Sequence, residues 1–210
     1  MAQTVTEEQL RDQLVALGAS LFQRGYVVGG AGNMSARLPD GNLLVTPTNS
    51  CFGRLDAARL SKIDMAGTVI SGDRPTKESV FHRMFYEKDA SVNAVVHLHS
   101  TYLTALSCLE GLDRDNALKP FTPYYVMKVG RLQVVPYLRP SHPDISKELA
   151  SRMDGSKAFL LANHGPIVIG ANFEETVNSA EELEETAKLH FLLQGKAVRY
   201  LTDAEVKELQ

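Results

Sequence analysis

Three histidines and one carboxylate form the group of residues best suited to chemistry in this sequence. His97 and His99 stand at the end of the apolar run Val92 to Val96, and His164 lies in a turn behind another apolar run. Side chains two residues apart in an extended strand share a face, so the imidazoles of His97 and His99 can reach one point. Three neutral imidazoles, with a carboxylate such as Glu78 that can bind and leave, describe an open zinc site able to act as a Lewis acid.

Each of these residues also has a purely structural interpretation. Strand histidines can pack or form hydrogen bonds beside a core, and His164 could bond to a carbonyl. Glu78 is expected in a helix first turn, where the helix dipole favours a carboxylate. The three histidines together favour a metal, with zinc preferred over other divalent transition ions. In that interpretation Glu78 is a ligand that becomes a proton carrier when substrate displaces it.

Three short polar segments could bind a phosphate. They are 32–35, which includes Asn33, 46–50, which includes Thr46 and Thr48, and 75–77, which includes Thr76 and Lys77. Together they offer hydroxyls, amide nitrogens, exposed backbone N–H groups and a helix N-terminus with a lysine. Turns use the same residue types for conformational reasons, so one segment alone carries little weight.

Other polar residues are not expected to take part in chemistry. His82, His142 and His190 lack such a grouping and are interpreted as structural or surface residues. The acidic run Glu181, Glu182, Glu184 and Glu185 is expected to be a solvated helix face.

The elements that must position these residues alternate between helices and strands. A capping box at Thr6 predicts a helix to about Arg24, and Asp40-Gly41 predicts a hairpin turn. Strands are expected around 34–38, 43–46, 92–97, 132–135, 158–161 and 167–169. Further helices are expected across 80–85, from about 100, from 143 to 153 and from 173 to 194. The stretch 119–125 is expected to be irregular. Several strand pairs are joined too tightly for parallel crossovers, which favours a mixed or mainly antiparallel sheet covered by helices.

The composition excludes several classes of protein. The chain has 210 residues, 44% of them hydrophobic and 22% charged, with a net charge of −3. These values predict one soluble globular domain, 1–210, and argue against a nucleic-acid binder. Cys51 and Cys108 follow no metal or redox spacing, which indicates free thiols and a cytoplasmic protein. Neither an export signal nor an apolar run of about 18 residues is present, so we expect no membrane span.

The motifs in their order resemble the class II aldolase/adducin family of zinc-dependent sugar-phosphate aldolases and epimerases. The resemblance covers nearly the whole chain. It is carried by Gly32-Asn33-Met34-Ser35, Thr46-Pro47-Thr48, Pro75-Thr76-Lys77-Glu78, His97-Leu98-His99 and Asn163-His164-Gly165. Within the family the chain is most similar to the bacterial 3-oxo-tetronate 4-phosphate decarboxylases, through segments 71–78, 95–101, 119–124 and 159–166.

The resemblance implies a fold, an assembly and a ligand set. The fold would be a three-layer α/β/α sandwich with a largely antiparallel sheet, and the assembly a homotetramer with active sites between subunits. One zinc per subunit would be held by Glu78, His97, His99 and His164, with Glu78 doubling as the acid/base.

The resemblance also implies substrate contacts. Asn33, Thr46 and Thr76 would fall among the phosphate contacts. Tyr124 would lie where a neighbouring subunit offers a tyrosine, although Tyr125 is adjacent and the spacing there departs from the aldolases. Lys77 is a second departure, because the fuculose-phosphate aldolases have serine at that place.

The expected reaction is the decarboxylation of 3-oxo-tetronate 4-phosphate to dihydroxyacetone phosphate and carbon dioxide. Breaking the C1–C2 bond of the chelated oxo acid would give a metal-bound enediolate, which Glu78 helps to protonate. Lys77 would bind anionic substrate oxygen, on the phosphate or on the departing carboxylate. One alternative is an aldolase or 4-epimerase acting on a pentose or hexose phosphate. Another is a non-catalytic module like the adducin head domain. In such a module we would expect some of the metal-binding residues to be missing.

Overall fold

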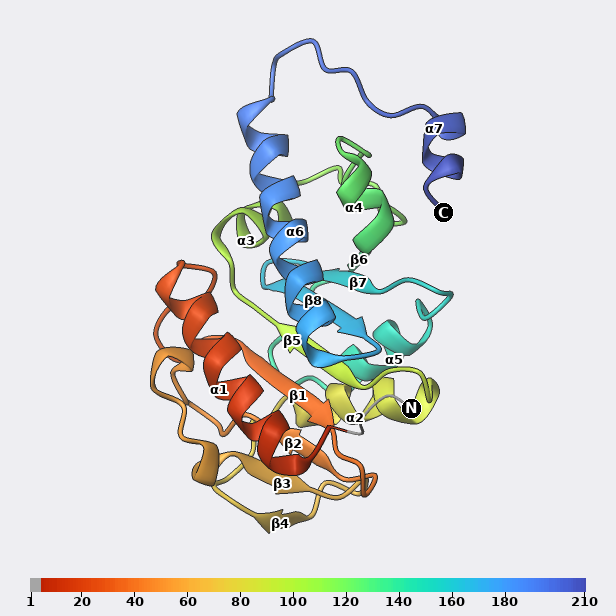
Figure 1. Ribbon diagram of the computed structural model, residues 1–210. Helices are drawn as coiled ribbons and strands as arrows, with labels where there is room; N and C mark the ends of the chain where they lie inside the picture. Colours follow the sequence, from red (N-terminus) through yellow and green to blue (C-terminus); the bar gives the residue numbers. More distant parts are fainter. Residues whose placement is uncertain (1–4) are drawn as a thin grey trace.

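The computed structural model describes residues 5–210, which form one eight-stranded sheet with helices on both faces (Figure 1). The strands are β1 (Asn33–Arg37), β2 (Leu43–Val45), β3 (Ser61–Ile63), β4 (Val69–Ser71), β5 (Ala94–His97), β6 (Leu132–Val135), β7 (Ala158–Leu161) and β8 (Gly165–Gly170). Their order across the sheet is β4-β3-β2-β1-β5-β8-β7-β6. Only the β6–β7 pair is parallel among the described strands, which confirms the mainly antiparallel sheet.

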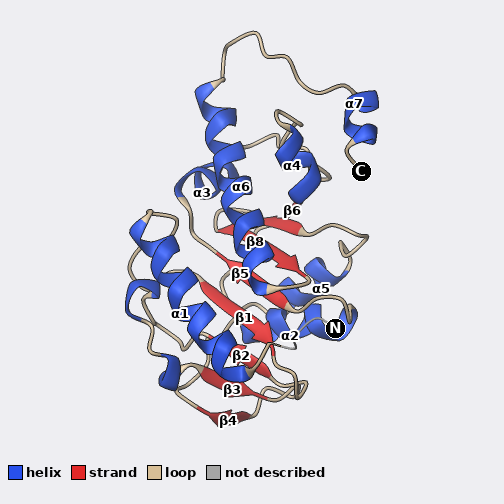
Figure 2. Ribbon diagram, viewed as in Figure 1, coloured by secondary structure: helices blue, strands red, loops and turns tan. Residues whose placement is uncertain are grey.

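The helices divide between the two faces of the sheet, as Figure 2 shows. They are α1 (Glu7–Gln23), α2 (Ser79–Lys88), α3 (Thr101–Ser107), α4 (Pro123–Lys128), α5 (Asp144–Ala150), α6 (Phe173–Leu192) and α7 (Asp203–Glu208), with short 3-10 turns η1 (Phe52–Arg54) and η2 (Ala57–Arg59). Helices α1, α3 and α6 cover one face, and α2 and α5 cover the other. The expected three-layer α/β/α sandwich is therefore confirmed.

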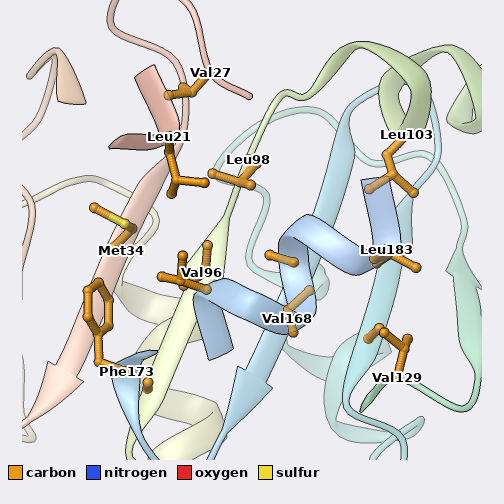
Figure 3. Close-up of a cluster of buried hydrophobic side chains, with 14 of the residues drawn as sticks. Leu21, Val27, Met34, Val96, Leu98, Leu103, Val129, Val168, Phe173 and Leu183 are labelled. Carbon is orange, nitrogen blue, oxygen red and sulfur yellow. The ribbon is translucent and has the colours of Figure 1, made fainter. Parts of the chain in front are cut away.

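Each face has its own hydrophobic core, because side chains alternate along the strands. On β5, Val96 belongs to the core under α1, α3 and α6, and Val95 belongs to the core under α2 and α5. Figure 3 shows the first of these cores, where Val96 lies among residues such as Met34 and Leu183. His97 follows the same alternation and projects to the face of α2.

The register of the central strands determines which polar residues are neighbours. Strand β1 pairs with β5 so that Asn33 lies opposite His97, and β5 pairs with β8 so that His97 lies opposite Ile167. The chain continues past His97 toward α3, and His164 stands in the turn before β8. The start of β1, the end of β5 and the β7–β8 turn therefore meet at one end of the central strands.

Several local predictions are confirmed. Thr6 and Gln9 form the expected capping box at the start of α1. Gly41 adopts a φ of 84° in the β1–β2 hairpin, a conformation that glycine takes without a side-chain clash. Cys51 and Cys108 are both free.

Other local predictions are wrong or incomplete. Helix α4 begins within the segment 119–125 that was expected to be irregular, and it continues to Lys128. It starts where the Thr122 hydroxyl accepts a hydrogen bond from the Tyr125 N–H and Pro123 takes the first helical position. Helix α7, with its capping box at Thr202, and the strands β3 and β4 were not anticipated. Strands β3 and β4 are each three residues long, which is too short to show the alternation of apolar and polar residues that predicts a strand. No helix of residues 5–210 is both long and apolar enough to span a bilayer.

Candidate metal centre and active site

The three histidines singled out by the sequence converge in space. Their candidate ligand atoms all lie within 4.8 Å of one another. The rings meet edge to face, with centroid separations of 4.9 Å for His97 and His99 and 4.7 Å for His99 and His164. Glu78 completes the group, because its Oε2 is 3.5 Å from His97 Nε2 and its Oε1 is 4.0 Å from His164 Nε2.

The four residues come from three separate parts of the chain. His97 ends β5, His99 lies in the segment before α3, His164 lies in the β7–β8 turn, and Glu78 occupies the N-cap position of α2. Strand β5 ends at His97, as expected, so His99 lies outside the strand. The two rings nevertheless share a face, and Glu78 precedes the first turn of α2 by one residue.

The protonation state of His97 suits metal binding. Its Nδ1 lies 2.8 Å from the carbonyl oxygen of Pro166. A carbonyl only accepts, so Nδ1 carries the hydrogen and Nε2 presents its lone pair to His99 and Glu78. Burial, with the neighbouring His164 and His99, holds the pKa of His97 well below its usual value. Burial also lowers the pKa of His99 and that of His164.

Neutral imidazoles and a carboxylate are the donor set that divalent transition metals require. His97 is fully buried, whereas His99 and His164 are half-buried, so the group can be reached from one side. These four residues fit a resident metal ion.

Two glycines allow the backbone around His97 to pack closely. A side chain at Gly32 would place its Cβ 2.8 Å from the carbonyl oxygen of His97, and Gly32 also has a φ of +76°. A Cβ at Gly165 would lie 2.4 Å from the carbonyl oxygen of Leu98. Real Cβ atoms do not come this close to another atom, so only glycine fits at either position. The segment that carries His97 and His99 is therefore held between the backbones of Gly32 and Gly165.

Helix α3 is anchored by a carboxylate whose role the sequence did not predict. Glu184 of α6 was expected on a solvated face, but only 6% of it is exposed. It accepts hydrogen bonds from the Ser100 hydroxyl at 2.6 Å and from the backbone N–H groups of Tyr102 at 2.7 Å and Leu103 at 2.9 Å. A carboxylate at a helix N-terminus is favoured by the unpaired N–H groups and by the dipole. Because α3 starts two residues after His99, Glu184 fixes the segment that carries this ligand.

The other end of α3 holds His164. The backbone N–H of His164 donates to the Ser107 hydroxyl at 3.1 Å, and the Thr104 hydroxyl donates to the His164 carbonyl at 3.3 Å. Asn163 takes a φ of 54° in this turn, and its N–H donates to the Ser107 carbonyl. Helix α3 therefore positions two of the three histidines.

Glu78 is held by a residue expected to contact phosphate. The Asn33 amide nitrogen donates to Glu78 Oε2 at 2.7 Å. The amide oxygen of Asn33 lies 2.6 Å from Nε2 of His82, which is fully buried. His82 was interpreted as structural, with no part in the site. The signal that could have found it is its position four residues after Glu78, a spacing that puts two side chains on one face of a helix.

The three polar segments lie side by side next to Glu78. The Thr76 N–H donates to the Thr46 carbonyl at 3.1 Å, and Pro47 pairs with Pro75. The Thr46 hydroxyl is buried and accepts from the Met34 N–H, and the Thr76 hydroxyl accepts from the Glu78 N–H. Thr48 is partly exposed.

Lys77 and the two candidate tyrosines differ in exposure. Lys77 is exposed and lines a pocket of about 120 Å³ with Glu78, Ser141 and His142. Tyr125 is fully buried, and its hydroxyl donates to Asn116 Oδ1 at 3.1 Å. Tyr124 is 62% exposed on α4. Of the two, only Tyr124 is accessible at the surface.

We predict that Glu184→Ala lowers the free energy of unfolding by about 2–4 kcal/mol, because three buried donors at the start of α3 lose their partner. The same variant should bind metal more weakly, since His99 precedes this helix. Urea unfolding and metal titration check both. The control is Glu185→Ala at an exposed neighbouring position, where a change within about 0.5 kcal/mol is expected. Equal stability of the two variants would contradict the assigned anchor.

We also predict that the metal-free protein loses stability as the pH falls below about 6.5. Burial lowers the pKa of His82 from 6.5 to about 3. The unfolded chain therefore binds a proton in this window that the folded chain does not, and stability falls by up to about 1.4 kcal/mol per pH unit for that group. Urea unfolding from pH 7.5 to 5 should show a shallower loss in His82→Gln than in the unsubstituted protein. Parallel pH dependences would contradict the prediction.

Comparisons with known proteins find relatives over most of the chain. Residues 12–191 match the family described as the class II aldolase and adducin N-terminal domain. The chain is 56% identical over 206 residues to the 3-oxo-tetronate 4-phosphate decarboxylase of Haemophilus influenzae, and the alignment covers 98% of each chain. The crystal structure of YgbL from Klebsiella pneumoniae superposes with a TM-score of 0.95 at 56% identity, covering 98% of this chain and 99% of that one.

A structure of L-fuculose 1-phosphate aldolase superposes with a TM-score of 0.83 at 26% identity, covering 95% of this chain and 93% of that one. The family match extends over most of the chain and includes all four converging residues. This protein therefore belongs to the class II aldolase/adducin family.

Proposed function

We propose that the chain is a zinc-dependent decarboxylase that converts 3-oxo-tetronate 4-phosphate to dihydroxyacetone phosphate and carbon dioxide. The observation that carries the proposal is the intact group of His97, His99, His164 and Glu78. It occurs in a chain that is 56% identical to a relative named for this decarboxylation. The intact group argues against a non-catalytic module.

The three histidines and Glu78 would hold the metal. Nitrogen donors with one carboxylate favour zinc. When bound, the ion supplies a Lewis acid that polarises the C3 carbonyl and stabilises the charge that develops as the C1–C2 bond breaks.

Residues of the chain itself would orient the substrate and move the proton. Glu78, held by the Asn33 amide, would take up a proton from solvent and pass it to the carbon that has lost carbon dioxide. Backbone N–H groups and hydroxyls of the segments around Asn33, Thr48 and Thr76 would bind the phosphate. Lys77, exposed beside Glu78, would bind an anionic oxygen of the substrate.

The proposal also includes an assembly. Tyr124, exposed on α4, would reach the active site of a neighbouring subunit in a homotetramer. Residence in the cytoplasm, inferred from the two free cysteines, stays a prediction.

An aldolase or 4-epimerase acting on a ketose phosphate is the second candidate. The structural likeness to L-fuculose 1-phosphate aldolase favours it, since the same donor set could stabilise charge after a different carbon–carbon bond breaks. Lysine at position 77 favours the oxo acid if it binds the departing carboxylate, because a ketose phosphate has no carboxylate.

We expect the purified protein to contain one zinc per chain and to release carbon dioxide from 3-oxo-tetronate 4-phosphate. His164→Ala should lose the metal and at least about 100-fold in kcat/KM, because one of the charge-stabilising ligands is removed. Elemental analysis and a carbon dioxide assay, run beside an assay for aldehyde release from ketose phosphates, check this. Aldehyde release without carbon dioxide would favour the aldolase, and absence of metal from both proteins would favour a non-catalytic module.

We expect Lys77→Ser to raise KM for the oxo acid about 10-fold or more, because a charge-assisted hydrogen bond is lost. Inhibition by dihydroxyacetone phosphate distinguishes the two possible contacts. Weaker inhibition indicates that Lys77 binds the phosphate, and unchanged inhibition indicates the departing carboxylate. Lys196→Ser, at an exposed position on the segment after α6, is the control. If Lys77→Ser leaves both turnover and KM unchanged, the role of Lys77 is wrong.

A further inference from the structure

A row of buried polar side chains connects Glu78 to the interior of the protein. Asn33 and Ser35 are two residues apart on β1, and His82 and Tyr86 are four residues apart on α2. Side chains two residues apart on a strand lie on one face, and so do side chains four residues apart on a helix. The pair on β1 and the pair on α2 can therefore face each other. His82 and Ser35 are fully buried, and Asn33 and Tyr86 are nearly so.

Short contacts join every member of this row. Asn33 Nδ2 is 2.7 Å from Glu78 Oε2, and Asn33 Oδ1 is 2.6 Å from His82 Nε2. His82 Nδ1 is 2.7 Å from the Ser35 hydroxyl, which is 2.7 Å from the Tyr86 hydroxyl. Both ring nitrogens of His82 are therefore engaged.

The direction of every hydrogen bond follows from the contact between Asn33 and Glu78. The Asn33 amide nitrogen donates to Glu78 Oε2, so its amide oxygen faces His82. That oxygen only accepts, so His82 carries its hydrogen on Nε2. A neutral ring then has a bare Nδ1, which accepts from the Ser35 hydroxyl, and Ser35 accepts from Tyr86. Burial keeps the ring neutral, since it lowers the pKa of His82 to about 3.

We propose that His82 is a positioning residue that holds Glu78 through the amide of Asn33. Its Nε2–H fixes the amide with the nitrogen toward Glu78, and the amide in turn holds the carboxylate beside His97 and His164. Without a donor at position 82, the buried amide oxygen of Asn33 would have no partner, and the amide would turn to find one. Its nitrogen would then leave Glu78, and the carboxylate would lose the contact that positions it. The inference rests on the proposed role of Glu78 as acid/base, and it adds the residue that orients it.

A spectroscopic test needs neither metal nor substrate. In metal-free protein with ¹⁵N-labelled histidine, the ring nitrogen shifts of His82 should report the neutral Nε2–H form at neutral pH. The same form is expected in Tyr86→Phe, because Ser35 keeps its own hydrogen to donate. An Nδ1–H form or a protonated ring in the unsubstituted protein would overturn the proposal.

A kinetic test separates positioning from mere stability. His82→Leu should lower kcat for decarboxylation by about 10- to 100-fold with KM changed less than about 3-fold, as expected for a misplaced catalytic group. His82→Gln should recover most of the loss, because its amide nitrogen can donate to Asn33 in place of Nε2.

Phe85→Leu is the control for stability. Phe85 is fully buried on the same helix and packs against Phe159, and its side chain has no polar atom to join the hydrogen bonds of the row. This variant should lose stability and retain kcat. Unchanged kcat in His82→Leu, or failure of His82→Gln to recover activity while both variants are folded, would overturn the proposal.

A third measurement keeps the inference separate from the proposed function. If the unsubstituted protein releases no carbon dioxide, the proposed reaction is wrong, and a crystal structure of metal-free His82→Leu then decides the role of His82. A Glu78 carboxylate displaced from Asn33 supports positioning by His82. An Asn33–Glu78 contact unchanged from 2.7 Å overturns it.

Discussion

The candidate site depends on one hydrogen bond, from Nδ1 of His97 to the carbonyl of Pro166. The same carbonyl accepts the backbone N–H of Leu98, so it fixes both the ring and the chain that continues to His99. Because the bond takes the only hydrogen of a neutral imidazole, Nε2 is left to accept a metal. Burial keeps the ring neutral, and the close approach of β8 to β5 keeps it buried. Gly165 makes this approach possible, since any side chain there would collide with the Leu98 carbonyl.

Around that bond, the protein uses buried polar groups to give rigidity to residues outside the strands. His99 and His164 lie in connecting segments, where backbone freedom is greatest. Helix α3 removes that freedom at both ends, through Glu184 at its N-terminus and Ser107 at its C-terminus. Glu78 is fixed in a comparable manner by Asn33. Lys77 lies beside this rigid group but is exposed, which suits its proposed contact with a charged substrate and not with the metal.

Much of the fold could be predicted because its signals are local. The capping box at Thr6, the Asp40-Gly41 turn and the apolar periodicity of α2 and α6 depend on residues within a few positions of one another. The predictions failed where the deciding contacts were distant or the elements short. Glu184 has the sequence signature of a surface acid, and only the packing of α3 against α6 buries it. Strand β3 forms because β2 offers it a partner, and β4 forms because β3 does.

The sequence by itself determined the chemistry available to this protein. It supplied three histidines, one carboxylate and the glycines that allow close packing, since residue types and short spacings are properties of the chain. Tertiary structure alone decided their geometry. The register of β1, β5 and β8 brought Asn33 opposite His97, and the packing of α2 on the sheet put His82 behind Asn33. The physical reason is that hydrogen-bond direction and burial depend on which groups come into contact across the fold. The local sequence around a residue does not specify these long-range contacts.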